Sequence, residues 1–238
     1  MNKRGQLTIF IIIAILVVAG VILFFVFRDD FGNKSSGGVN SDPLQIYVQE
    51  CIDELLITGI QLIGIQGGYY YMPEEFLLTE YADIAYGYNN EKVLISKSEL
   101  EKQINYYIED VVYMCVYNEV ILSSLVDVGE PKARTYLQGD KILVKLDFPL
   151  AFEKGKSSSR IRDFKSEIDL DLEDFLSVSN EIINQASTND GYLDLSYLTD
   201  LDYIVTIIPN SGSFVYSLKN ENIKLNEEEF IFNFAYKK

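Results

Sequence analysis

Hydrophobic residues are unevenly spread along the chain, and their longest run stands near its beginning. Residues 6–27 hold 22 positions without a charged side chain. A helix of that length is roughly 33 Å long, against about 30 Å for the hydrocarbon core of a bilayer. A cleaved secretory signal has a shorter apolar region that ends in small residues. The pattern therefore predicts a retained transmembrane helix over residues 6–28, after a short basic leader of residues 1–5.

The apolar pattern then stops and resumes. Residues 29–42 are rich in Gly, Ser, Asn and charge, which is typical of a flexible linker. Within this linker Asn33 begins an Asn-Lys-Ser triplet, which makes it a candidate glycosylation site. Residues 43–238 are numerous enough to bury a core. They are expected to form one domain, with a further boundary considered near residues 128–131.

Three stretches of this domain carry apolar residues at helical spacing. The first begins at Pro43, a favourable first helical residue, and ends in the Gly-rich residues 64–68. The second begins at Ser96 or Ser98, each followed three residues later by Glu, as in a capping box. The third covers residues 172–186. We therefore expect about three helices.

Alternation of apolar and polar residues predicts strands elsewhere. Two hairpins are predicted over residues 81–96 and 132–148, the second turning at Gly139-Asp140. Further strands are predicted over residues 163–172, 201–208, 214–218 and 229–236. Hairpin connections favour an antiparallel sheet with helices packed on one face. The expected fold class is α+β, with the transmembrane helix preceding this domain.

Charge and composition exclude several function classes. The chain has 36 Asp and Glu against 20 Lys and Arg, a net charge of −16, so we do not expect nucleic acid as a partner. It contains no His, which removes Ser-His and Cys-His nucleophile systems and most zinc and haem sites. What remains for an enzyme is carboxylate, Lys, Ser or Tyr chemistry. No cofactor is expected.

Acidic residues gather at Asp169, Asp171, Glu173 and Asp174, and again at residues 227–229. A calcium loop needs ligands that converge from a Gly-containing turn. Here the first two residues alternate along a predicted strand, and the next two open a helix, where acids suit the helix dipole. The pattern favours a solvated face over a metal site. A glycosidase-like carboxylate pair stays a lesser alternative.

Cys51 and Cys115 are the only two cysteines. They fall on the apolar stripes of the first two predicted helices, and they come level if those helices pack antiparallel. In a domain outside the membrane, such a pair favours a disulfide. The alternative is two buried free thiols. A redox-active role is not expected, because the chain has no Cys-x-x-Cys spacing.

Tyr69, Tyr70 and Tyr71 are adjacent, so they cannot all point into one core. An exposed member of this group could contact a partner or a glycan. The alternative is that these rings pack within the fold and keep their hydroxyls in water.

The residues before the apolar segment carry a recognisable motif. A basic pair at residues 3–4, then Gly5, then Gln6-x-Thr leading into an apolar helix, resembles the class III signal peptide of archaeal type IV pilin-like proteins. The resemblance implies a cut between Gly5 and Gln6 on the cytoplasmic side. It also implies a retained helix that can form a filament core through Leu7–Phe27. The chain departs from bacterial-type pilins at Phe10, where they carry Glu. The remainder resembles uncharacterised membrane-anchored proteins of small-genome archaea, which implies no activity.

Together these features predict a single-pass membrane protein of the archaeal cell surface, with its N-terminus cytoplasmic and its C-terminal domain extracellular. The leading function is non-enzymatic, either a pilin-like filament subunit or a membrane-tethered adhesin. The alternative is an anchored binding or scaffold domain that never assembles and keeps Gly5-Gln6 uncut. An extracellular hydrolase that uses carboxylates ranks third. The expected partners are the lipid bilayer and other copies of the chain.

Overall fold

The structure is a computed structural model that describes residues 43–117, 119–154, 157–189 and 192–237. The predicted leader, transmembrane helix and linker, with Gly5, Gln6 and Asn33, lie outside these residues. Within the described ranges, no helix is both long and apolar enough to cross a bilayer. Residues Asp42–Lys238 form one compact unit.

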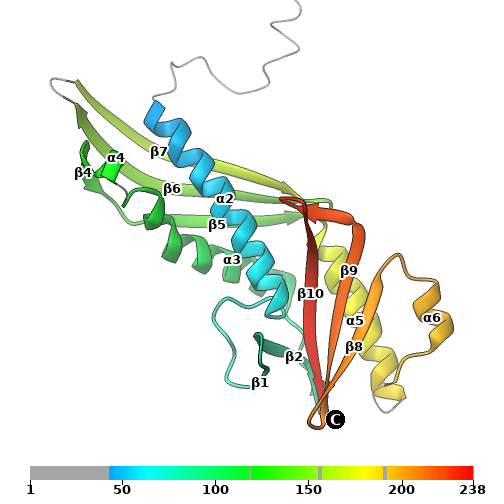
Figure 1. Cartoon of the computed structure of the whole chain (residues 1–238). Coiled ribbons are helices and arrows are strands. Elements are labelled where there is room, and N and C mark those ends of the chain that lie inside the picture. Colours follow the sequence, from blue (N-terminus) through cyan, green and yellow to red (C-terminus); the bar gives the residue numbers. More distant parts are fainter. Residues whose placement is uncertain (1–42, 118, 155–156, 190–191, 238) are drawn as a thin grey trace, which may run out of the picture. The chain divides into compact units, whose positions relative to one another are not determined.

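This unit has the predicted α+β class, but its strands form two sheets (Figure 1). The helices are α2 (Pro43–Ile65), α3 (Lys97–Val111), α4 (Glu119–Leu122), α5 (Leu172–Thr188) and α6 (Leu195–Thr199), with a 3-10 helix η1 (Val112–Cys115). The strands are β1 (Phe76–Leu78), β2 (Asp83–Asn89), β3 (Glu91–Lys92), β4 (Leu125–Val128), β5 (Lys132–Gln138), β6 (Lys141–Lys154), β7 (Ser157–Asp169), β8 (Ile204–Asn210), β9 (Ser213–Leu225) and β10 (Glu228–Lys237).

The six-stranded sheet has the order β1-β2-β10-β9-β8, and β3 pairs with β2. Its pairs are antiparallel except β2 with β10, which run parallel. The prediction of an antiparallel sheet is therefore wrong for this pair. A tight turn forces antiparallel pairing, but β2 and β10 lie far apart in sequence, and no turn fixes their direction.

The four-stranded sheet is antiparallel throughout. The long strand β6 pairs with β4 and β5, and also with β7. The boundary considered near residues 128–131 falls between β4 and β5, two strands of this sheet.

The core of the six-stranded sheet is a row of aromatic residues along β10. Phe230, Phe232, Phe234 and Tyr236 alternate along the strand and are all at most 1 % exposed. Helix α5 packs against this strand and against β2. The ring of Phe175 on α5 packs edge-on against the ring of Phe230, and the two ring centroids lie 4.9 Å apart. This geometry suits the ring quadrupoles.

The inner face of the four-stranded sheet is covered by α2 and α3. Helix α2 packs against β7, β10 and α3, while α3 packs against β5 (Figure 1). A glycine permits the close approach of the two helices, because a Cβ on Gly59 would lie 2.1 Å from Cε1 of Tyr107. A disulfide joins Cys51 on α2 to Cys115 in η1, with their Cα atoms 5.7 Å apart. This agrees with the predicted pairing.

Helix α3 also covers the free edge of β5, through side chains four residues apart. Glu101 accepts a hydrogen bond from the Leu137 N–H at 2.9 Å, and Glu109 accepts one from the Ala133 N–H at 2.7 Å. Between them, the Thr135 hydroxyl donates to Asn105 Oδ1 at 2.8 Å. The spacing of these contacts along α3 matches their spacing along β5, because four helical residues rise about 6 Å and two strand residues about 6.8 Å. The helix therefore takes the place of a neighbouring strand.

Candidate ligand-binding face

The outer face of the four-stranded sheet is the side opposite α2 and α3. Its side chains alternate with the buried ones along each strand and are exposed or half-buried. We define the outer face by Lys132, Arg134 and Tyr136 of β5, Lys141, Leu143, Lys145 and Asp147 of β6, and Asp163, Lys165, Glu167 and Asp169 of β7. Only one of these, Leu143, is apolar.

Three cations stand side by side across the centre of this face. Arg134 lies opposite Lys145, and Lys145 lies opposite Lys165. We call these three residues the cation row. Like charges directly opposite each other on neighbouring strands are destabilising. The sheet therefore holds an arrangement that does not serve its own stability.

The cation row also departs from the charge balance of the whole chain. Residues 132–165 contain nine Lys and Arg and four Asp and Glu, a net charge of +5. Since the chain carries −16, the remaining residues carry −21. Positive charge is thus concentrated on one sheet of an acidic protein, which is typical of a surface that attracts anions.

Neighbouring carboxylates form ion pairs with only part of the cation row. Lys165 is ion-paired with Glu167, and this cation lowers the pKa of that carboxyl. The Lys145 ammonium lies 5.6 Å from the centroid of the Tyr136 ring. Among the described side chains, Arg134 has no ion pair. The row therefore keeps at least one cation outside any direct ion pair, although the charge of Arg134 helps to lower the pKa of the Asp147 carboxyl.

Arg162, which is not a member of the row, holds the carboxylate of Asp147 in place next to the row. Arg162 donates two hydrogen bonds to Asp147, at 2.5 and 2.7 Å, and these lower the pKa of the Asp147 carboxyl. Asp147 therefore stays ionised at neutral and mildly acidic pH. Its oxygens remain able to accept hydrogen bonds.

A shallow hollow of about 550 Å³ lies over this face. Its volume is within the roughly 300–1,000 Å³ of small-molecule sites. The hollow is lined by Lys132, Arg134, Tyr136, Lys145, Leu146, Asp147, Asp163, Phe164 and Lys165. It thus combines the cation row with two carboxylates and an aromatic ring.

A second candidate surface is the tyrosine cluster on α3 and the loop after α2. The N–H groups of Tyr70 and Tyr71 both donate to Oε1 of the buried Gln103, at 3.0 and 2.9 Å. The Tyr71 hydroxyl donates to Asp110, which raises the Tyr71 pKa to about 12. The Tyr71 ring lies 5.7 Å from that of Tyr106, and both are exposed. The adjacent tyrosines thus divide between the fold and the surface.

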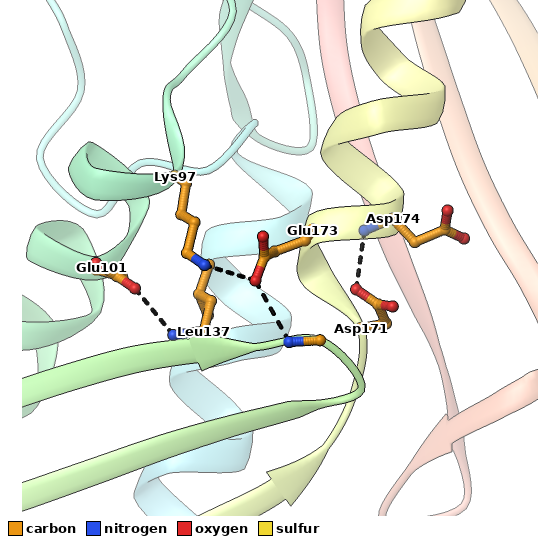
Figure 2. A network of polar contacts seen from close by, with 7 residues as sticks. Lys97, Glu101, Leu137, Asp171, Glu173 and Asp174 are labelled. Carbon is orange, nitrogen blue, oxygen red and sulfur yellow. Dashed lines mark hydrogen bonds and ion pairs between the residues drawn. The ribbon is translucent and has the colours of Figure 1, made fainter.

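The acidic residues around the start of α5 hold elements together. Figure 2 shows Asp171 capping the helix, with its Oδ1 accepting from the Asp174 N–H at 2.9 Å. Glu173 accepts from Lys97 Nζ at 2.6 Å and from the Gly139 N–H at 3.4 Å. The hydrogen bond from Lys97 lowers the pKa of Glu173. These carboxylates tie α3 and the β5–β6 turn to α5.

The other acidic residues singled out by sequence also make ordinary contacts. Lys141 forms an ion pair with Asp169 at 3.5 Å, and Lys219 forms one with Glu229 at 2.8 Å. Glu228 accepts from Gln61 at 3.4 Å, and Glu227 lies in the β9–β10 turn with φ +68°. Within the described ranges, no group of three or more His, Cys, Asp or Glu side chains is placed to hold a metal ion.

The cation row was missed by sequence reasoning, although the sequence was enough to place two of its three members. The predicted turn at Gly139-Asp140 sets Gln138 opposite Lys141 and therefore Arg134 opposite Lys145. The third member depends on the register of β6 with β7, which shifts between Asp147 and Leu150. No pattern of residues in the sequence predicts that shift.

Comparison with known proteins adds no relative. No family model, no curated protein and no solved structure matches the chain. A function must therefore be argued from the residues themselves.

Proposed function

We propose that this chain is a non-enzymatic, single-pass membrane protein that displays its α+β domain at the archaeal cell surface, as a pilin-like subunit or a tethered adhesin. The disulfide between Cys51 and Cys115 carries the proposal. Disulfides persist in oxidising compartments and are rare in the cytosol. Together with the uncharged segment at residues 6–27, the disulfide supports a domain outside the membrane.

The non-enzymatic part is supported by the roles of the acidic residues. In a chain without His, a hydrolase would depend on carboxylates. The clustered carboxylates are instead held within the fold: Asp171 accepts a hydrogen bond from the Asp174 N–H, and Glu173 accepts one from Lys97. An open, charged sheet face with a shallow hollow is better suited to binding than to excluding water around a reaction.

Surface display is tested by adding protease to intact cells. We expect cleavage in the predicted linker, residues 29–42, and release of the domain that follows it, since exposed linkers are preferred sites of proteolysis. A cytoplasmic protein of the same cells serves as the protected control. Because intracellular proteins of hyperthermophilic archaea also hold disulfides, location must be measured separately from oxidation. Full protection of the domain, alongside digestion of a known surface protein, would overturn the proposal.

The filament branch is tested at the predicted processing site. Cutting after Gly5 removes the cations Lys3 and Arg4, whose passage into hydrocarbon costs several kcal/mol. The freed helix could then pack against copies of itself. We expect Gly5→Leu to leave an uncut precursor, whereas the control Gly20→Leu, within the apolar segment, is still cut. Equal processing of both variants would leave the anchored domain as the better account.

A further inference from the structure

We infer that the cation row binds an acidic polysaccharide, whose carboxylates meet Arg134, Lys145 and Lys165 while its hydroxyls donate to the carboxylates beside the row. The inference rests on the proposed function, because a domain displayed at the cell surface would meet such polymers there. It names the ligand of the outer face.

The shape of the site suits a linear ligand. The row crosses three neighbouring strands. Since strands lie about 4.8 Å apart, the row extends roughly 10 Å at right angles to them. A single extended chain with regularly placed negative groups fits this line. The hollow of about 550 Å³ over the same residues provides room for it.

An anion bound to the row would relieve the repulsion between its cations. Three aligned cations repel one another, and an anion lying between them removes that repulsion. Arg134 has no ion pair among the described side chains, and its planar guanidinium can bind a carboxylate through two hydrogen bonds. Within the row only Lys165 is directly ion-paired, to Glu167, while Arg134 acts on the Asp147 carboxylate without an ion pair. The anion that completes the row must therefore come from outside it.

The residues that flank the row suit the neutral parts of a sugar. On one side, Lys132 lies opposite Asp147, which lies opposite Asp163. On the other side, Tyr136 lies opposite Leu143. Sugar hydroxyls can donate to the two carboxylates, and a sugar ring can pack on the aromatic and apolar pair.

The same flanks disfavour other anionic surfaces. A membrane of anionic headgroups, or a nucleic acid, would press phosphates against Asp147 and Asp163, and like charges at such distances repel. The acidic remainder of a second copy is opposite in charge to the row, but its carboxylates would meet Asp147 and Asp163 with the same repulsion. An acidic polysaccharide satisfies both kinds of group at once.

The test is binding of the full chain, held in a non-ionic detergent, to immobilised polygalacturonate. We expect saturable binding that weakens as salt rises, and no binding to the neutral polymer dextran. The double variant Arg134→Gln/Lys145→Gln should bind at least tenfold more weakly, since it removes two charge-assisted contacts to the polymer. The matched control Lys224→Gln/Lys237→Gln makes the same change in net charge at two other exposed lysines, and should bind as the parent does.

Three results would overturn the inference. The row variant could bind polygalacturonate as tightly as the parent. Vesicles of phosphatidylglycerol could bind through the same residues in place of the polysaccharide. The row could instead drive self-association of the chain, seen by sedimentation, with no retention on the polymer. Each of these leaves the intact-cell protease result unchanged, so failure of the ligand and failure of the surface location remain distinguishable.

Discussion

The two faces of the four-stranded sheet are built from alternate residues of the same strands, and they serve different purposes. On the inner face Ile142, Val144 and Leu146 are at most 3 % exposed beneath α2 and α3. On the outer face Lys145 is exposed within the cation row. Since side chains alternate in direction along a strand, one position separates a stabilising residue from a ligand-facing one. Stability and binding should therefore respond to different substitutions.

The largest effect is expected on the inner face. Ile142→Ala removes a fully buried side chain and leaves a cavity, so the free energy of unfolding should fall by about 2–5 kcal/mol. Urea unfolding followed by circular dichroism measures this loss. A change below about 0.5 kcal/mol would mean that the inner face is not packed as described.

The next effect concerns the helical layer that covers this face. The disulfide closes a loop with a sequence separation of 64 residues between α2 and η1. In the chain-entropy account its reduction lowers the free energy of unfolding by at most roughly 4 kcal/mol. The unfolding midpoints of the oxidised and reduced protein provide the comparison. Identical midpoints would show that this link contributes nothing to the layer.

A smaller effect is expected at the edge of β5. Glu109→Ala leaves the Ala133 N–H without its acceptor, so stability should fall by about 1–3 kcal/mol. Glu109→Gln is the matched control, because its amide oxygen can still accept, and it should stay within about 0.5 kcal/mol of the parent. If both variants unfold alike, α3 does not replace a strand at this edge.

The smallest change in stability belongs to the outer face. Lys145→Gln should alter the free energy of unfolding by less than about 0.5 kcal/mol, with a slight gain because like charges no longer face each other. Its binding to polygalacturonate should still weaken about tenfold, as expected for one charge-assisted contact. A large loss of stability here, comparable with that of Ile142→Ala, would break the division between the two faces.

Local signals explain what could be predicted from the sequence. Ser96, one of the two predicted starts, caps α3 by accepting from the Glu99 N–H. The turn at Gly139-Asp140 appears between β5 and β6, with Gly139 at φ +58°. These features depend on residues a few positions apart, whose chemistry the sequence displays directly.

Long-range pairing explains what could not be predicted. The parallel contact of β2 with β10 joins Tyr86 to Ala235, almost 150 positions away, and it is selected by packing in the folded domain. The third cation of the row is placed by a register shift in β6 and β7. The disulfide could be predicted because both cysteines lie on apolar stripes of predicted helices. The sequence also offers neither of them another cysteine as a partner.

The most direct test of the account is the mass of the native protein, purified from cells in the presence of an alkylating reagent that blocks free thiols. A domain displayed in an oxidising compartment through a processed apolar helix should give a chain that begins at Gln6. Cys51 and Cys115 should be joined and unalkylated. A chain that begins at Met1 and carries two alkylated cysteines would contradict both the processing and the compartment.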